Sequence, residues 1–364
     1  MTSGALGLLT GLLLACSSSS TGSDPLAPAP TGSVAPAPSA PASPTTPTTP
    51  KAPPVYDVLA ELATGDGRVV AAAQDTDFLY LLVAPSVFGG SGALRSIAKT
   101  DGTIKDLVSV RTPYGGSLVL DGSDLFFGAA QEGGGSSVVP LIMKYSLAGA
   151  KLTALTHGQN ELFDLTGLLV EGANVFFTTP RTIKQVARTG GTYTDVRTID
   201  GPYLGVALDS TSVYGFGMKG IFHGARTGTQ ALTPFSGAAL GAVEPRVPGQ
   251  IVVGGDAVMV RSSSRDFGEE RLFHCPKSGT TCTRLYNGSY LFGLATHDGL
   301  TYVSSIEKGL VAFDANAKIV VEIPDARREG SVILVDDTSL VQIASISNGD
   351  TTKFYVDRAV RKGH

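Results

Sequence analysis

A short pattern that recurs seven times along the chain constrains its architecture more than any other feature. In each copy an apolar run is followed by four turn-forming residues and a second apolar run, as in Leu120-Asp121-Gly122-Ser123-Asp124-Leu125-Phe126-Phe127. The first runs end at Ala73, Leu120, Val170, Leu208, Val253, Ala295 and Val335, so successive copies lie 38 to 50 residues apart. A repeat of this length built from short strands is typical of a β-propeller with one blade per copy. The sequence therefore predicts an all-β fold with seven four-stranded antiparallel blades.

Each copy can be divided into four expected strands. In the second copy these are residues 116–120, 125–129, 141–146 and 151–156, where β-branched and aromatic residues alternate with others. The turn before the fourth strand often begins with a basic residue and contains glycine, as at Lys99, Arg188, Arg226 and Lys277. We expect these basic residues on the exposed outer edge of each blade, where charge discourages pairing with other chains.

The two ends of the repeat region complement each other. After Val335 the last copy contains strand-like runs only at 340–344 and 353–356, so it lacks an outer strand. Residues 55–62 form a strand-like run before the first copy and have no blade of their own. We predict that this N-terminal strand completes the last blade and thereby closes the ring.

The first 15 residues resemble a bacterial lipoprotein signal peptide. Residues 5–15 are an apolar run, and Leu13-Leu14-Ala15-Cys16 resembles the lipobox in which the cysteine is lipidated, with palmitate among its acyl chains. No Lys or Arg precedes the apolar run, and the alternative interpretation is a disordered apolar tail. The signal predicts an exported protein with a membrane anchor at Cys16.

A long segment of low complexity separates this signal from the repeats. Residues 16–54 are mostly Ser, Thr, Ala and Pro, a composition that cannot bury a core and that predicts a disordered tether. The remaining residues, 55–364, are expected to form the propeller domain. Ser17 after the cysteine resembles lipoproteins sorted to the outer membrane, so we expect a cell-envelope protein exposed to the periplasm or the cell surface.

Charge and cysteine content narrow the classes of ligand. The chain has 28 basic and 32 acidic residues dispersed along it, which does not indicate a nucleic-acid partner. Cys275 and Cys282 flank a six-residue turn, and in an oxidising compartment they are expected to form a disulfide that contributes about 2 kcal/mol. The alternative is a zinc site that also uses His223 and His274, but the cysteine spacing is not typical of one. We predict no metal and no other cofactor.

Acidic pairs also occur within the repeated turn. Asp75 with Asp77, Asp121 with Asp124, and Asp336 with Asp337 suggest calcium by their charge alone. Because aspartate in tight turns accepts backbone hydrogen bonds, and because no EF-hand-like loop follows, we interpret these residues as turn formers.

The copies resemble bacterial propellers of the TolB-like and YVTN-like kind. The resemblance covers residues 55–364 and rests on loose motifs: a strand, an aspartate turn, an aromatic strand and a turn with a basic residue and glycine. It implies extracytoplasmic binding or scaffolding more often than catalysis. The chain has no Trp, so the Trp-Asp dipeptide of other propeller families is missing. We assign no catalytic residue.

The connections between blades carry the candidate binding residues. Aromatic residues precede four of the anchors at similar spacing and are expected near the mouth of the central channel: Tyr114, Phe163, Tyr203 and Tyr290. Such aromatics suit recognition of proteins or carbohydrates, whereas the alternative is packing between blades. Charged loops on the same face contribute a second set of candidates: Arg261, Arg265, Arg271, Arg327 and Arg328. The alternative for these is an ordinary solvated loop.

These patterns favour a non-enzymatic, lipid-anchored propeller. We expect a monomer that presents one face to a protein or an envelope polysaccharide. The first alternative is a hydrolase or lyase that acts on a polysaccharide or a small metabolite at the channel mouth. The second alternative is a structural envelope protein without a specific ligand.

Overall fold

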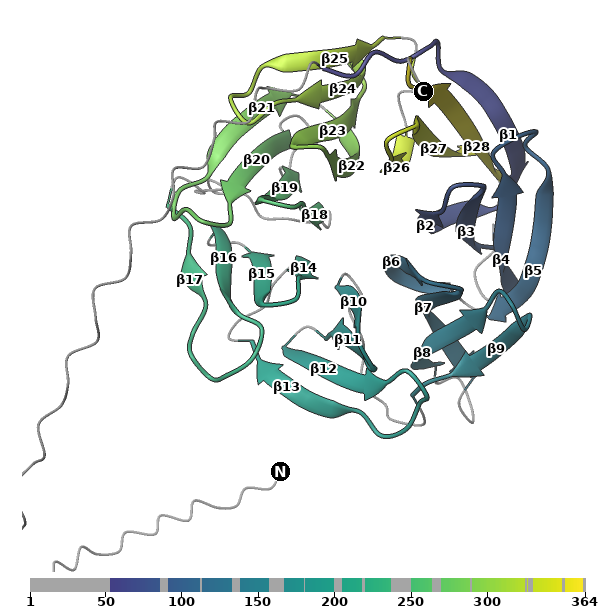
Figure 1. The fold of residues 1–364 in the computed structure, drawn as a ribbon, viewed down its shortest axis with the longest axis vertical. Helices are drawn as coiled ribbons and strands as arrows, with labels where there is room; N and C mark the ends of the chain where they lie inside the picture. Colours follow the sequence, from purple (N-terminus) through teal and green to yellow (C-terminus); the bar gives the residue numbers. More distant parts are fainter. Residues whose placement is uncertain are drawn as a thin grey trace, which may run out of the picture. The chain divides into compact units, whose positions relative to one another are not determined.

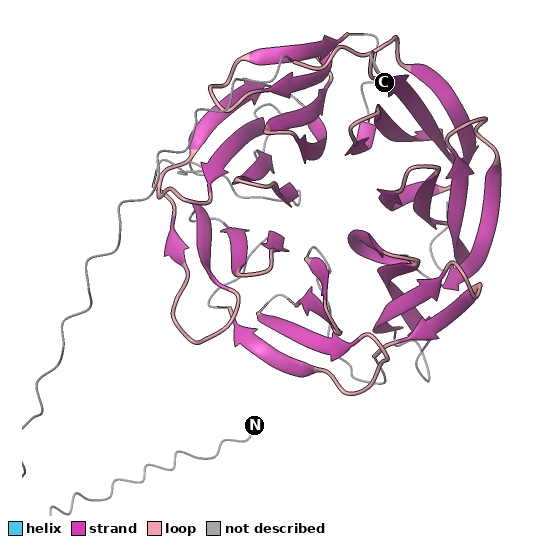
Figure 2. Ribbon diagram, in the orientation of Figure 1, coloured by secondary structure: helices cyan, strands magenta, loops and turns pink. Residues whose placement is uncertain are grey.

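The strands are arranged as a ring of seven four-stranded sheets (Figure 1). The computed structural model describes residues 53–85, 91–111, 113–132, 138–156, 167–179, 181–199, 205–217, 220–236, 250–263, 270–288, 290–324, 326, 330–348 and 351–362. Within these ranges every regular element is a strand (Figure 2). No helix of the described part has the length and hydropathy needed to cross a membrane. The predicted all-β, seven-bladed fold is confirmed.

Each of the first four blades is a sheet in which four consecutive strands pair in chain order from the channel outward. Blade 1 contains β2 (Arg68–Gln74), β3 (Phe78–Ala84), β4 (Ser91–Ala98) and β5 (Ile104–Arg111). Blade 2 contains β6 (Pro113–Asp121), β7 (Asp124–Glu132), β8 (Val138–Ser146) and β9 (Lys151–Ala154). Blade 3 contains β10 (Leu168–Glu171), β11 (Asn174–Thr178), β12 (Thr182–Ala187) and β13 (Thr194–Thr198). Blade 4 contains β14 (Gly205–Leu208), β15 (Ser212–Gly217), β16 (Gly220–Ala225) and β17 (Thr233–Pro234).

The last three blades follow the same plan, with one exchange of strands. Blade 5 contains β18 (Gln250–Val253), β19 (Ala257–Ser263), β20 (Glu270–Pro276) and β21 (Thr283–Gly288). Blade 6 contains β22 (Leu291–His297), β23 (Leu300–Ser305), β24 (Gly309–Phe313) and β25 (Ile319–Ile323). Blade 7 contains β26 (Gly330–Val335), β27 (Ser339–Asn348), β28 (Thr351–Val360) and, as its outer strand, β1 (Ala60–Asp66).

The outer strand of blade 7 comes from the N-terminal end of the domain. β1 pairs antiparallel with β28, from Ala60 opposite Arg358 to Asp66 opposite Lys353. The paired strand starts and ends later in the sequence than the expected strand at 55–62. The chain stays extended as far as Gly67, whose φ of 109° allows the turn into β2. Upstream of β1, Tyr56 forms an isolated antiparallel bridge with Arg361.

The core consists of separate layers between neighbouring blades. Because successive side chains of a strand point to opposite faces, Leu79 and Leu81 of β3 pack toward Phe354 of blade 7. Tyr80 of the same strand packs with Phe127 of blade 2. The described residues form one such cluster at every blade junction. Stability therefore depends on contacts between neighbouring blades.

The repeated aspartate shapes the turn between the first two strands of several blades. Oδ1 of Asp336 accepts hydrogen bonds from the backbone N–H groups of Thr338 (2.8 Å) and Ser339 (2.6 Å). Asp75 and Asp209 accept the equivalent pair of bonds in blades 1 and 4. The interpretation of the aspartates as turn formers is confirmed for Asp75 and Asp336.

Candidate functional site

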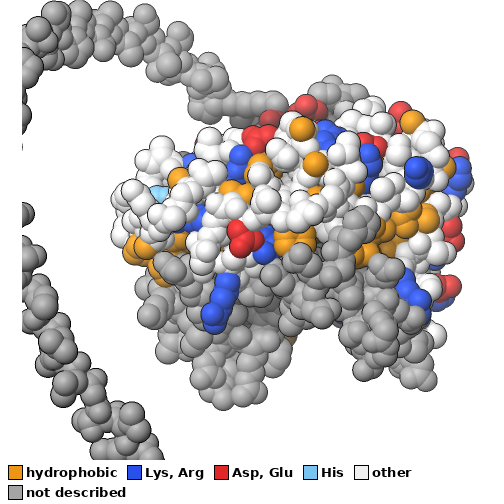
Figure 3. All heavy atoms as spheres, turned by 90° about the horizontal axis from the view of Figure 1, so that it is seen from below, with side chains coloured by type: hydrophobic (Ala, Val, Ile, Leu, Met, Phe, Trp, Pro, Cys, Tyr) orange, Lys and Arg blue, Asp and Glu red, His pale blue; other side chains and the backbone are white. Residues whose placement is uncertain are grey.

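The ring has two different faces. Because adjacent strands are antiparallel, the connections between first and second and between third and fourth strands lie at one end of the blades, here called the turn face. The connections between second and third strands and between blades lie at the opposite end, here called the loop face. Acidic and basic side chains are interspersed over the side of the domain seen in Figure 3.

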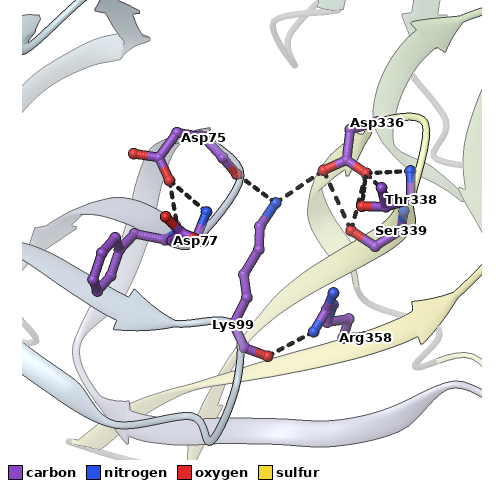
Figure 4. Close-up of polar contacts among 8 residues, drawn as sticks. Asp75, Asp77, Lys99, Asp336, Thr338, Ser339 and Arg358 are labelled. Carbon is purple, nitrogen blue, oxygen red and sulfur yellow. Dashed lines mark hydrogen bonds and ion pairs between the residues drawn. The ribbon is translucent and has the colours of Figure 1, made fainter. Parts of the chain in front are cut away.

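The basic residue that ends the third strand lies between blades, contrary to the expectation that it would occupy the exposed outer edge. Lys99 of blade 1 is only 3% exposed. Its Nζ donates to the Asp75 carbonyl oxygen (2.7 Å) and to Oδ2 of Asp336 in blade 7 (2.9 Å; Figure 4). The prediction was wrong because the side chain points back along the turn face to the acidic turn of the preceding blade.

The same relationship is repeated at four further junctions of the described chain. Each pair joins a basic residue to an acidic residue in the first turn of the preceding blade. The pairs are Arg188–Asp121 (2.6 Å), Arg226–Glu171 (2.6 Å), Lys277–Asp209 (2.9 Å) and Arg361–Asp298 (3.7 Å). The turn face therefore carries these five ion pairs between neighbouring blades, and the basic residues in these pairs have a structural role.

Aromatic rings lie under two of these cations. The guanidinium carbon of Arg226 is 4.1 Å from the ring centroid of Phe176, and that of Arg188 is 5.1 Å from that of Phe126. Both rings belong to the second strand of the preceding blade, so each arginine combines an ion pair with a cation–π contact.

The ion pairs perturb the acids that they contain. Burial acts to raise the pKa of Asp209, but the hydrogen bond from Lys277 and those from the Thr211 and Ser212 backbone outweigh it and lower the pKa to about 2. The pKa of Asp336 is lowered far below its usual range, because Lys99 and the Thr338 hydrogen bonds outweigh the opposing effect of burial. Both carboxylates are ionised at neutral pH and bind the adjoining blade.

One cluster on the turn face has the composition of a metal site, and the sequence analysis did not identify it. His297, Asp298 and Asp337 place three potential ligand atoms within 4.8 Å of one another. Arg361 lies 3.7 Å from Asp298, so a positive charge already neutralises part of the cluster. The cluster joins blades 6 and 7 through His297 and Asp337, whose atoms are 3.3 Å apart.

Cys275 and Cys282 form a disulfide across the turn between β20 and β21, with an S–S distance of 1.97 Å. Both thiols are thereby used, which removes the cysteines from the alternative zinc site. Burial lowers the pKa of both His223 and His274, which favours their neutral forms. His274 is buried, and the His223 ring packs 4.3 Å from that of Phe235.

The loop face surrounds the mouth of a channel along the axis of the ring. The channel contains a cavity of about 750 Å³, lined by residues of the inner part of all seven blades. Its wall is mostly aliphatic, with Ser117, Gln250, Arg68 and Arg261 contributing polar groups. Arg68 and Gln250 begin their strands, so these groups lie toward the loop face.

Arg261 is tied to the wall between blades 5 and 6. Its Nη1 lies 3.3 Å from Oε2 of Glu270 and donates to the Leu291 carbonyl oxygen. Burial lowers the pKa of Arg261, and the adjacent Glu270 carboxylate partly offsets this effect. Arg261 is a recognition candidate of the charged loop, and the structure places it in a partly buried ion pair with Glu270, where its side chain lines the channel.

Tyr290 is exposed to solvent, and the peptide group that follows it makes two hydrogen bonds. Tyr290 has a φ of 52°, which is unusual for a residue other than glycine, and its side chain is 42% exposed. The Leu291 N–H donates to Oε2 of Glu270 (2.7 Å), and the Ile306 N–H donates to the Tyr290 carbonyl oxygen (3.3 Å). The backbone that carries the exposed ring is therefore held on the loop face next to the Arg261–Glu270 ion pair, of which Arg261 lines the channel.

The other candidates are only partly covered by the structure. Arg271 lies on β20, where it pairs with Ser262 and Asn287 and is half-buried. Tyr114 lies within β6, and its side chain is not described. The remaining candidates fall outside the described residues: Cys16, Phe163, Tyr203, Arg265, Arg327 and Arg328.

Comparison with known proteins supports the fold. No protein-family model matches the chain, and no curated protein matches it. The computationally designed Ika8 protein is similar in structure, with a TM-score of 0.50, 13% identity, and coverage of 81% of this chain and 99% of that one. The extracellular domain of a putative hybrid two-component system from B. thetaiotaomicron has a TM-score of 0.51 and 11% identity, with 82% and 40% covered.

A third solved structure of similar extent is BamB from Moraxella catarrhalis. It has a TM-score of 0.47 and 14% identity, with 82% of this chain and 99% of that chain covered. Sequence identities this low show a similarity of fold alone.

Proposed function

We propose that this protein is a lipid-anchored envelope protein of the TolB-like or YVTN-like kind whose loop face binds a protein partner. The observation that carries the proposal is Tyr290, an exposed aromatic side chain on a backbone held in a left-handed conformation. Strained backbone of this kind is retained at functional sites when surrounding contacts fix it. Tyrosine is also enriched among residues that dominate protein–protein binding energy.

The two ends of the described domain lie together on the turn face. The Lys362 N–H donates to the Val55 carbonyl oxygen (2.7 Å), so both ends of the described domain meet at the turn-face end of blade 7. The loop face lies at the opposite end of the blades.

The Cys275–Cys282 disulfide is consistent with a location outside the reducing cytoplasm. Together with the lipobox-like sequence around Cys16, it supports export, and Ser17 favours the outer membrane. Substitution Cys16→Ser should shift the protein from the membrane fraction to the soluble fraction of the envelope. A substituted chain that stays with the membranes would contradict the anchor.

The face can be tested by photo-crosslinking within the full chain. A benzophenone amino acid at position 290 would report contacts of the loop face. The matched position is 78, because Phe78 is similarly exposed (40%) but begins β3 on the turn face. We expect a protein adduct from position 290 and none from position 78. Adducts from position 78 alone, or from neither position, would contradict the proposal.

A further inference from the structure

The outer strand of blade 4 ends early and continues onto the neighbouring blade. β17 contains only Thr233 and Pro234, which pair with His223 and Phe222 of β16. The Phe235 N–H still donates to the Ile221 carbonyl oxygen (2.9 Å). After this bond the chain leaves its own blade.

Ser236 pairs with the disulfide-bonded turn of blade 5. Its N–H donates to the Thr280 carbonyl oxygen (2.6 Å), and its carbonyl oxygen accepts from the Cys282 N–H (2.8 Å). Its hydroxyl lies 2.9 Å from the Thr280 carbonyl oxygen and 2.7 Å from Oγ1 of Thr281. Four hydrogen bonds therefore connect one residue of blade 4 to three successive residues of blade 5.

The disulfide fixes the shape of the turn that Ser236 contacts. Cys275 and Cys282 lie next to the last β20–β21 pair, His274 opposite Thr283, and their Cα atoms are 4.2 Å apart. Cys275 is 0% exposed and Cys282 is 5% exposed, and both pack in the same cluster as Phe235 of blade 4. The two cysteines are thus buried in an apolar layer that also contains Phe235 of blade 4.

We propose that the Cys275–Cys282 disulfide is a redox-sensitive clasp that holds the outer end of blade 4 against blade 5. A dithiol reductant would open it by thiol–disulfide exchange. One thiolate of the reductant attacks one cysteine sulfur, and the S–S bond breaks to give a mixed disulfide and to release the other cysteine as a thiolate. The second thiolate of the reductant then attacks the reductant's own sulfur in the mixed disulfide and releases the first cysteine as a thiolate. Both cysteines gain a proton, and the reductant leaves as a cyclic disulfide.

The effect of reduction is local. The two blades still share an apolar layer that includes Tyr214, Phe216, Val260 and Phe273. Loss of the turn geometry frees Ser236 from its hydrogen bonds to blade 5 without removing this layer. The coupling is reciprocal, so weakening the Ser236 contact also exposes the sulfurs to reductant. The inference is independent of partner binding at the loop face.

Hydrogen exchange tests the first half of the proposal. The full chain with Cys16→Ser, which leaves one cysteine pair, is compared in oxidised form and after reduction with dithiothreitol. We expect amide exchange in segments 232–236 and 280–283 to accelerate at least roughly tenfold, with blades 1 and 2 unchanged. Unchanged exchange in these two segments, or equal acceleration in every blade, would overturn the proposal.

The rate of reduction tests the second half without any cysteine substitution in the domain. Ser236→Ala removes the two hydroxyl contacts, and Ser347→Ala is the matched control. The Ser347 hydroxyl is also exposed and pairs with Thr352 (3.0 Å), far along the chain in blade 7. We expect Ser236→Ala to shorten the half-time of reduction by roughly threefold or more relative to Ser347→Ala. Equal half-times for the two variants would overturn the proposal.

Discussion

Lys99 of blade 1 donates a hydrogen bond to Asp336 of blade 7, 2.9 Å away, across the junction between the first and last blades. The two residues are far apart in sequence, and their contact links the beginning of the repeat array to its end. Arg358 of blade 7 reinforces it by donating to the Lys99 carbonyl oxygen (2.6 Å; Figure 4). This junction is therefore held by side chains as well as by the shared apolar layer.

Replacing Lys99 by methionine should destabilise the domain by about 2 kcal/mol, because Asp336 loses a partner in a partly buried site. Urea unfolding at neutral pH measures the loss. Lys362→Met is the control, since the Lys362–Asp57 pair spans 3.6 Å and both side chains are more than half exposed. An exposed pair of this kind contributes at most about 0.5 kcal/mol. Equal losses in the two variants would contradict the structural role of Lys99.

The lowered pKa values predict an acid-sensitive domain. The pKa of Asp209 falls from its ordinary value of 3.8 to about 2 on folding, so folding favours its ionised form. Its contribution to stability is present above the unfolded pKa and is lost as the pH falls through about 2. Melting temperatures measured from pH 7 to pH 2 should decrease mainly below pH ~4. Asp209→Asn should flatten that decrease, and an identical pH profile would argue against this contribution.

Alanine substitutions at two glycines distinguish the cost of a steric collision from the cost of backbone strain. Gly102 and Gly122 both have positive φ, 75° and 60°, so alanine is strained at either site. A Cβ at Gly102 would collide with the Leu62 carbonyl oxygen of blade 7, whereas one at Gly122 would meet nothing within 4 Å. We expect Gly122→Ala to cost about 1 kcal/mol and Gly102→Ala roughly 1–3 kcal/mol more. Chemical unfolding of both variants measures the difference, and equal losses would contradict the close approach at this junction.

Removal of the N-terminal strand should lower the stability of the whole domain. A chain that starts at residue 64 loses the hydrogen bond between the Tyr56 and Tyr302 hydroxyls (3.1 Å) and the core residue Ala63. We expect its melting temperature to fall by more than about 5 °C relative to a chain that starts at residue 53. Calorimetry checks this, and an unchanged melting temperature would show that the outer strand of blade 7 is dispensable.

The sequence predicted the repeat far better than the contacts between its copies. The anchors Leu120 and Val335 end or nearly end first strands, because apolar runs followed by aspartate turns are local signals. The position of Lys99 was predicted incorrectly, because edge protection and interblade pairing both require a basic residue at that turn. An acidic residue recurs in the first turn of the preceding blade, and this recurrence is the sequence signal that distinguishes interblade pairing from edge protection.

The candidate site was predictable only in part. The spacing before the anchor at Ala295 identified Tyr290 on the loop face, but its left-handed backbone depends on Glu270 and Ile306, which no local pattern reveals. Arg261 appeared to be a loop residue by its charged surroundings, although β19 extends to Ser263 and carries it into the channel wall. The length of β19 at the loop face therefore determines that Arg261 lies in the channel wall, and turn residues alone do not encode the length of a strand.

The central claim is that the loop face binds a protein through Tyr290. The most direct test is the affinity of the full chain for the protein that crosslinks at position 290, compared among wild type, Tyr290→Ala and Phe78→Ala. We predict that Tyr290→Ala weakens binding at least about tenfold at an unchanged melting temperature, and that Phe78→Ala binds as wild type does. Wild-type affinity for Tyr290→Ala, or equal weakening in both variants, would contradict the claim.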